Sequence, residues 1–328
     1  MKRAAFLSAV LLALALASSC TLVNVSVAPE TKPLEEKVLE GEGGGKILLL
    51  TLDGSISFGE ESEGLVRRKR PSKAAFFREA LGKAEGDGDL AGVVLRINSP
   101  GGTAAASDAI YHEIMRFKEK RKIPVYAYIM ELGASGGYYV ASAADRIVAA
   151  PSAVTGSIGV IAVKLNIEGL LAKIGVTDET YKSGPKKGFW LPFHPSSPEE
   201  REMLQGIIDA LHERFVDVVH QGRKGRLSRD EVAALADGRI MDAASALRAG
   251  LVDEVAYLDE ALESMKRAAG IEEARVVTYA RPGDFRSNIY SRMPLSPGEG
   301  PEAINIISIG GDDLSLFSGV RFMYLWDP

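Results

Sequence analysis

Short hydrophobic runs alternate with amphipathic stretches through the first half of the chain. The runs are apolar at consecutive positions, which is typical of strands buried on both faces of a parallel sheet. Helix signals lie between them, with Ser72 as the N-cap of a helix to about Lys83 and a second helix over 103–120. This alternation predicts an α/β fold with a mostly parallel sheet. The expected strands cover residues 46–52, 91–97, 124–130 and 146–149.

The pattern becomes helical beyond residue 195. Ser197 precedes Pro198, Glu199 and Glu200, an order that gives an N-cap, a proline at the first helical position and acidic side chains in the first turn. We expect this helix to reach about His220. Shorter helices and one late strand should follow, with helix starts at Ser228, Asp242 and Asp259 and the strand over 275–279.

The first 20 residues have the pattern of a secretory signal. Lys2 and Arg3 precede an apolar stretch over 4–17, and small residues lead to Cys20. The end of this segment is similar to a bacterial lipobox, although Ala17 stands where a larger aliphatic residue is usual. We therefore expect a signal peptide over 1–19 and lipidation of Cys20. An uncleaved anchor helix and ordinary secretion are the alternatives, and all three place the remaining chain outside the cytoplasm.

Composition excludes several classes of protein. The chain has 328 residues, 46% of them hydrophobic and 25% charged, which excludes a disordered chain and a protein of many membrane spans. A net charge of −5 argues against nucleic-acid binding. The single cysteine excludes an intramolecular disulfide and a cysteine-based zinc cluster. We expect no cofactor or metal.

We expect three parts after the signal segment. A Pro- and Gly-containing tether covers residues 20–45, one folded domain covers 46–281, and a tail without an assignable role covers 282–328.

Two glycine-rich segments follow expected strands, at 100–102 and 133–137. In a parallel sheet the carboxyl ends of the strands meet at one edge, where active sites gather. Ser135 lies in the second segment, at the predicted turn from a strand into a helix, where free N–H groups and the helix dipole favour an anion. An acyl-transfer nucleophile needs these surroundings, because its transition state carries an oxyanion. A Ser that only caps the helix is the structural alternative.

A serine nucleophile needs a base, and the sequence offers two kinds. His112, His212 and His220 fall on predicted helices, and His194 falls in a loop. The other kind is lysine, which is neutral in only about one molecule in a few thousand at pH 7 unless its surroundings lower its pKa of about 10.4. A lysine-bearing turn with bulky apolar neighbours holds Lys182, Lys186 and Lys187, which could equally form a solvated basic loop.

Five motifs, taken in order, resemble the signal peptide peptidase (SppA) family of membrane-anchored serine proteases with a Ser–Lys dyad. The resemblance covers about residues 46–270 and implies a fold like ClpP and the crotonases, with repeated β-β-α units and a helical C-terminal part. The motifs are Arg-Ile-Asn-Ser-Pro-Gly-Gly at 96–102, Ala-Ser-Gly-Gly-Tyr-Tyr at 134–139, Thr-Gly-Ser-Ile-Gly-Val at 155–160, Ser-Gly-Pro-Lys-Lys at 183–187 and Ala-Asp-Gly-Arg at 236–239.

The resemblance implies a role for each matching residue. Ser135 falls on the nucleophile, Lys187 on the general base, and Ser157 on a serine that orients the lysine. Gly102 and Gly136 fall on the positions whose N–H groups form the oxyanion hole. Lys186 adjoins Lys187, so the register between these two lysines is the least secure part of the match.

The resemblance also implies a substrate and an assembly. Members of the family degrade remnant signal peptides in the membrane. Because each motif occurs once, the chain is similar to the short form, whose copies assemble into a ring in which a neighbour helps to complete each site. We therefore expect a homo-oligomer, an octamer by analogy.

Other readings of the same residues remain open. The segment 133–137 also fits the G-x-S-x-G turn of Ser-His-Asp α/β-hydrolases, with His212 or His220 as the base. A crotonase-like acyl-CoA enzyme would share the fold, although an extracytoplasmic address disfavours CoA chemistry. A catalytically inactive scaffold member of the fold is the alternative without enzyme activity.

Overall fold

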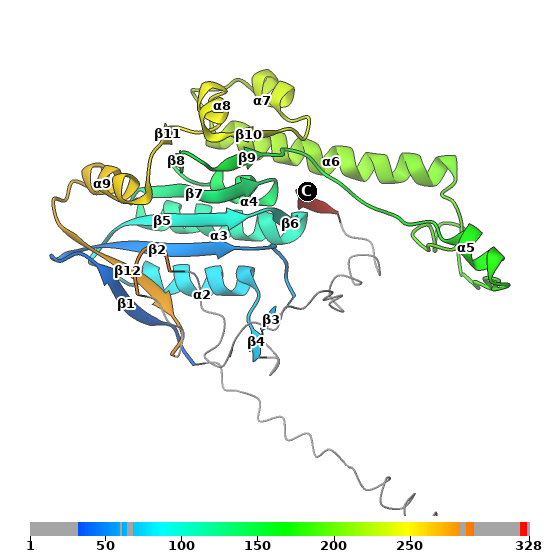
Figure 1. The fold of residues 1–328 in the computed structure, drawn as a ribbon, viewed down its shortest axis with the longest axis horizontal. Helices are drawn as coiled ribbons and strands as arrows, with labels where there is room; N and C mark the ends of the chain where they lie inside the picture. The colour runs from blue at the N-terminus through cyan, green and yellow to red at the C-terminus, as the bar shows by residue number, and fades with distance from the viewer. Residues whose placement is uncertain (1–31, 60, 64–67, 283–286, 292–321, 327–328) are drawn as a thin grey trace, which may run out of the picture. The chain divides into compact units, whose positions relative to one another are not determined.

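The computed structural model describes residues 32–59, 61–63, 68–282, 287–291 and 322–326 (Figure 1). The expected signal peptide, Cys20 and most of the tail lie outside these residues. Among the described residues, no helix combines the length and the apolar character needed to cross a bilayer.

Nine strands of the described chain form one sheet. They are β1 (Glu35–Glu40), β2 (Gly45–Asp53), β5 (Leu90–Ser99), β7 (Val125–Ala134), β8 (Arg146–Ala149), β9 (Val154–Gly156), β10 (Ile240–Asp242), β11 (Glu254–Val255) and β12 (Ala274–Ala280). The order is β1-β12-β2-β5-β7-β8-β11, with β9 also on β7 and β10 on β9. Every pairing from β12 to β11 is parallel, and β1 and β10 add antiparallel strands. The predicted α/β fold with a mostly parallel sheet is confirmed.

Two short sheets and eight helices complete the described chain. One short sheet pairs β3 (Glu61–Glu63) with β4 (Arg68–Arg70), and the other pairs β6 (Gly101–Thr103) with β13 (Met323–Leu325). The helices are α2 (Lys73–Glu85), α3 (Ala104–Arg121), α4 (Gly136–Ala141), α5 (Glu168–Lys173), α6 (Pro198–Gly222), α7 (Arg229–Leu235), α8 (Ala243–Arg248) and α9 (Leu258–Ala269).

Side-chain caps fix several helix starts at the residues that the sequence predicts. The hydroxyls of Ser72 and Thr103 accept hydrogen bonds from the first turns of α2 and α3. Ser197 and Ser228 form capping boxes with Glu200 and Glu231, which satisfy two otherwise unpaired N–H groups at each start. These caps hold the boundaries of the helices that surround the site.

The core lies between the sheet and its helices. Ile47, Leu48, Leu49 and Leu50 are all fully buried on β2, as expected for a strand covered on both faces. Helix α9 packs on β5 and β7, while α2 packs against α3 and α3 against α4. Gly92 on β5 allows this close packing, because a Cβ there would lie 2.5 Å from the sulfur of Met265 on α9.

Strand β7 carries the site-forming end of the sheet. Its first part, Tyr126 to Ile129, pairs with β8, and its last part, Leu132 to Ala134, pairs with β9. The same edge of the sheet therefore presents the carboxyl ends of both β7 and β9. This is where a parallel sheet places its functional groups.

The structure differs from the sequence pattern at the first strand of the sheet and at the end of β7. Residues 35–40, within the expected tether, form β1 and pair antiparallel with β12, so the sheet begins before residue 46. The ion pair between Lys46 and Glu36, at 3.0 Å, joins this charged strand to β2. Strand β7 extends beyond the predicted end at residue 130, because residues 132–134 pair with β9, and helix α4 begins only at Gly136.

Candidate active site

Ser135 lies at the turn between β7 and α4 with a strained backbone. Its φ of 52° and ψ of −116° lie outside the regions that L-residues prefer. Two hydrogen bonds of 2.8 Å hold the turn. The Ser135 N–H donates to the Gly156 carbonyl, and the Tyr139 N–H donates to the Ser135 carbonyl. Only 1% of Ser135 is exposed, and its hydroxyl has no hydrogen-bond partner among the described residues. A buried, unpaired hydroxyl on a strained turn is typical of a functional residue.

Gly102 and Gly136 bring two backbone segments close together beside Ser135. A Cβ on Gly102 would lie 1.9 Å from the Ile56 carbonyl oxygen, and one on Gly136 would lie 2.5 Å from the Ser107 hydroxyl. Only glycine therefore fits at these positions without moving the neighbours. The Gly136 N–H belongs to the first turn of α4 and has no acceptor within that helix. Donors of this kind suit an oxyanion.

Ser157 directly follows β9, as Ser135 directly follows the neighbouring strand β7. Ala134 and Gly156 are register partners of β7 and β9, and one serine follows each of them. Ser157 is 8% exposed, has a φ of 49°, and donates its N–H to the Arg239 carbonyl at 2.7 Å. A pocket of about 440 Å³ opens beside it, with His212, Asp209 and Gln205 in its wall. The structure thus brings four of the five expected catalytic positions together.

Lys187 is the expected catalytic residue for which no described contact with Ser135 exists. It lies in a turn, where its N–H donates to the Gly184 carbonyl at 3.1 Å, and its side chain is exposed. The neighbouring ammonium of Lys186 forms an ion pair with Glu199. The Lys187 ammonium has no such partner in the described part of the chain. Of the two lysines, Lys187 is therefore the one left available for another role.

Lys187 belongs to a long excursion from the domain, which we call the arm (residues 160–210). Figure 1 shows α6 running out from the sheet toward α5, and the buried apolar residues of α6 lie only in its second half, from Phe215 to Val219. Helix α5 has no buried residue. Lys164 stabilises the arm by donating to the Phe189 carbonyl at 2.8 Å, and desolvation lowers the pKa of its ammonium.

Apolar side chains are exposed along the arm to an unusual degree. Tyr181 is 91% exposed, Ile174 64% and Leu170 59%. A concentration of exposed apolar groups marks an interaction site more often than a solvated face. Further exposed members are Ile161, Val163, Leu165, Val176, Met203 and Ile207.

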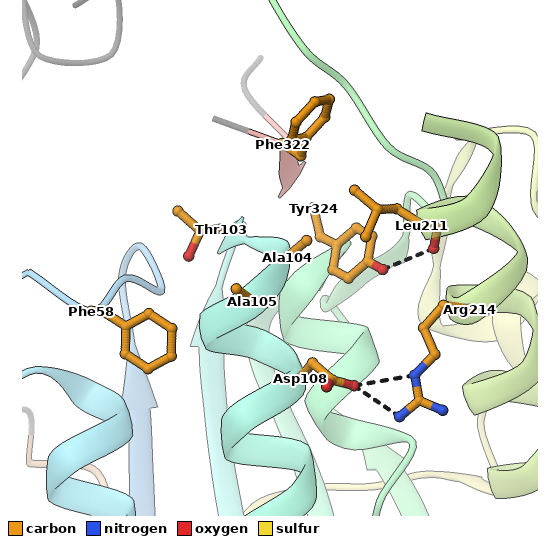
Figure 2. A pocket seen from close by; sticks show the side chains of 9 residues that line it. All are labelled: Phe58, Thr103, Ala104, Ala105, Asp108, Leu211, Arg214, Phe322 and Tyr324. Atoms are coloured by element: carbon orange, nitrogen blue, oxygen red, sulfur yellow. Dashed lines mark hydrogen bonds and ion pairs between the residues drawn. The ribbon is translucent and has the colours of Figure 1, made fainter. Parts of the chain in front are cut away.

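The tail strand β13 also reaches this site, and the sequence pattern does not predict it. Tyr324 stacks on Tyr139, with ring centroids 5.0 Å apart, and packs against Phe215, with ring centroids 4.7 Å apart. Burial raises the pKa of both the Tyr324 and Tyr139 phenols. Figure 2 shows Tyr324 directed at Leu211, beside the ion pair of Asp108 with Arg214. The signals available in the sequence were the second tyrosine of 138–139 and the apolar run 322–326, which had no assignable role.

The histidines make no described contact with Ser135. His212 and His220 bind the carbonyls of Ala236 and Leu227, at 2.7 and 3.2 Å, and His194 lies near the Pro195 carbonyl on the surface. His112 has no described side-chain hydrogen bond. The arrangement required for a Ser-His-Asp triad is therefore not formed by the described residues.

Comparisons with known proteins identify the family of this chain. The family model for peptidase family S49 matches residues 117–272. A protein named "Putative signal peptide peptidase SppA" from Enterococcus faecium is 39% identical over 265 residues, which cover 80% of this chain and 76% of the relative. "Serine protease SPPA, chloroplastic" from Arabidopsis thaliana is 34% identical over 211 residues, covering 62% and 30% of the two chains.

Among solved structures, a point mutant of the 1510-N membrane-bound stomatin-specific protease covers 68% of this chain and 85% of its own, at 16% identity and a TM-score of 0.43. The sequence relatives are the stronger finding, because their identity extends over most of the folded domain. The chain belongs to peptidase family S49 and is a serine protease.

Proposed function

We propose that Ser135 is the nucleophile of this protease and that Lys187 of a neighbouring copy is its general base. The observation that carries the proposal is the state of the Ser135 hydroxyl, which is buried, unpaired among the described residues and held on a strained turn. A hydroxyl that served only to cap α4 would bond to the N–H groups of that helix, and it makes no such bond.

The position of Lys187 supports a base supplied by a second copy. Its side chain is exposed on an arm that leads away from the sheet, and the arm also carries the exposed apolar side chains. Packing that surface against another copy would bury the apolar groups and remove water from the lysine, and loss of water favours its neutral form. The pocket beside Ser157 offers an incoming amine a place to bind.

The proposed reaction passes through an acyl-enzyme. Neutral Lys187 takes the proton of the Ser135 hydroxyl while the Ser135 oxygen attacks a peptide carbonyl. The N–H groups of Gly102 and Gly136 stabilise the oxyanion that forms. The charged lysine then returns the proton to the leaving amine, and water hydrolyses the acyl-serine. Ser157 is the positioning residue that accepts a hydrogen bond from the ammonium between these steps.

We propose further that the enzyme works at the extracytoplasmic face of a membrane, on remnant signal peptides. The support is the signal-like segment 1–19, which directly precedes Cys20, together with the name of the Enterococcus faecium relative. A lipid on Cys20 would hold the domain where cleaved signal peptides remain. Mass spectrometry of the mature N-terminus tests this part, since an acylated Cys20 supports it and an intact Met1 supports a helix anchor instead.

Two substitutions and a matched control test the dyad. We expect Ser135→Ala and Lys187→Ala each to abolish hydrolysis of a synthetic signal peptide by the assembled protein. Lys186→Ala removes a neighbouring ammonium that is ion-paired with Glu199, so it should retain most of the activity. Replacing all four histidines should also leave hydrolysis in place. Loss of activity with Lys186→Ala and retention with Lys187→Ala would move the base by one residue.

A further inference from the structure

The fifth sequence motif, Ala-Asp-Gly-Arg at 236–239, forms a turn that contacts the main chain around Ser157. The Ser157 N–H donates to the Arg239 carbonyl at 2.7 Å. The Gly238 N–H donates to the Ile158 carbonyl at 3.1 Å. One bond lies before the Ser157 side chain along the chain and the other lies after it. The turn therefore fixes the backbone of Ser157 from both directions.

The turn and β9 are packed too closely to move independently. Strand β10 directly follows the turn and pairs antiparallel with β9, with Ile240 as the register partner of Gly156. A Cβ on Gly156 would lie 2.8 Å from the Arg239 carbonyl oxygen, and its φ of 93° also favours glycine. Ser157, the next residue, has a φ of 49°, which is costly for serine. Displacing the Arg239 carbonyl would remove the bond that holds Ser157 in this conformation.

The Asp237 carboxylate holds the turn in its shape. One of its oxygens accepts a hydrogen bond from the Arg239 main-chain N–H at 3.1 Å and another from the Arg239 Nε at 2.8 Å. The other oxygen accepts from the Arg239 Nη2 at 2.5 Å. The bond to the N–H two residues on is a local turn that aspartate commonly forms. A single side chain thus fixes both the main chain and the side chain of the residue that holds Ser157.

The carboxylate keeps its charge at neutral pH. The hydrogen bonds from Arg239 lower the pKa of Asp237 to about 2. They are therefore fully present above about pH 4 and are lost only as the pH falls toward about 2. Both side chains are half exposed, so this ion pair contributes little to the free energy of unfolding. Its loss can change the site while the protein stays folded.

The same turn forms part of the wall of the pocket beside Ser157. Asp237 and Gly238 both line this cavity of about 440 Å³. In the proposed function, the cavity receives the ammonium of Lys187 from a second copy. The turn thus determines the place of Ser157 and of one wall of the cavity in which the lysine is held.

We propose that Asp237 is a positioning residue of this protease, which acts through the Arg239 carbonyl to hold Ser157 in place for the lysine base. This inference rests on the proposed function, in which Ser157 accepts a hydrogen bond from the lysine. The carboxylate touches neither the substrate nor the reacting atoms. Its contribution is the geometry of the turn.

Substitution of Asp237 in the full-length, assembled protein tests this role. Asp237→Ala removes all the hydrogen bonds from the carboxylate, so we expect kcat on a synthetic signal peptide to fall about 5- to 20-fold while KM changes less than about 2-fold. Asp237→Asn keeps an oxygen for the Arg239 N–H but loses the charged pair, and its kcat should fall only about 3-fold. A parental kcat in a folded Asp237→Ala protein would overturn the proposal. If the alanine variant fails to fold, a parental kcat of Asp237→Asn would overturn it.

An exposed carboxylate elsewhere on the chain provides the matched control. Asp217 on α6 is exposed to a similar extent and forms an ion pair with Arg229 at 2.9 Å. Asp217→Ala should therefore leave both kcat and KM unchanged. A loss equal to that of Asp237→Ala would show that any missing surface ion pair slows the enzyme, and would overturn the specific role of Asp237.

A double variant shows whether Asp237 acts through Ser157. Ser157→Ala removes the hydroxyl that the turn is proposed to hold, so adding Asp237→Ala to it should lower kcat by less than about a further 2-fold. Independent effects multiply, so a double variant that shows the product of the two single losses would overturn the proposal.

The outcomes separate this proposal from the proposed function. A parental kcat in Ser157→Ala would contradict the proposed role of Ser157 toward the lysine, whatever Asp237→Ala does. An impaired Ser157→Ala together with a fully active Asp237→Ala would leave that role intact and would contradict the positioning by Asp237 alone.

Discussion

Ser135 and Ser157 follow a register pair of neighbouring strands, and both have a left-handed φ, of 52° and 49°. Such angles are costly for serine, and two of them side by side at the carboxyl edge of a sheet indicate a site that the surrounding structure holds in place. The Ser135 N–H donates to Gly156, the residue before Ser157, so the two turns are joined directly.

Substitution of Ser157 tests its positioning role. Ser157→Ala should lower kcat by about 10- to 100-fold, the loss expected for one hydrogen bond to a charged group. Ser157→Gly relieves the left-handed backbone but also lacks the hydroxyl, so it should be at least as stable and equally impaired. Activity restored by glycine but not by alanine would show that only the backbone matters. A pH–rate profile that shifts in both variants would support contact with the base.

Gly102 should not tolerate a side chain. Because a Cβ there would overlap the Ile56 carbonyl, Gly102→Ala should displace β6, lower the melting temperature and abolish hydrolysis. Gly82→Ala is the matched control, since Gly82 lies inside α2 with open space around it. That change should stabilise the protein by about 0.5–1 kcal/mol and leave activity intact. A Gly102→Ala protein with full activity and an unchanged melting temperature would contradict the expectation that a side chain here displaces β6.

The apolar arm predicts self-association. Leu170→Glu combined with Ile174→Glu places two charges at α5, and we expect the assembly to dissociate and hydrolysis to fall with it. Light scattering coupled to size exclusion measures the change. Leu247→Glu replaces an equally apolar, 41% exposed side chain on α8, outside the arm, and should leave the mass unchanged. A monomeric parent protein, or a double variant with unchanged mass, would contradict the role of the arm.

Local rules predicted the regular elements of the fold. The apolar runs of β2, β5, β7 and β8 and the helix starts at Ser72, Ser197 and Ser228 lie where the pattern places them. These features depend on residues close together in the chain. The edge strand β1 was missed because its sequence is mostly charged and only its pairing with β12 makes it a strand.

The site residues also divide into those that a local motif predicts and those that depend on distant parts of the chain. Ser135, Ser157, Gly102 and Gly136 could be named because short motifs carry them, and the strands on which they lie meet through regular parallel pairing. Tyr324 could not, since more than two hundred residues separate it from Gly102 and no local pattern specifies that pairing. Lys187 could be named from its motif, but its exposed place on the arm is a property of the folded chain.

Mixing two inactive variants tests the central claim most directly. Co-assembled Ser135→Ala and Lys187→Ala subunits can form a complete site where the intact Ser135 of one copy meets the intact Lys187 of another. In an equal mixture we expect about a quarter of the sites to be functional, with hydrolysis in proportion, while each variant alone is inactive. A mixture that assembles fully and remains as inactive as its components would show that one chain supplies both groups.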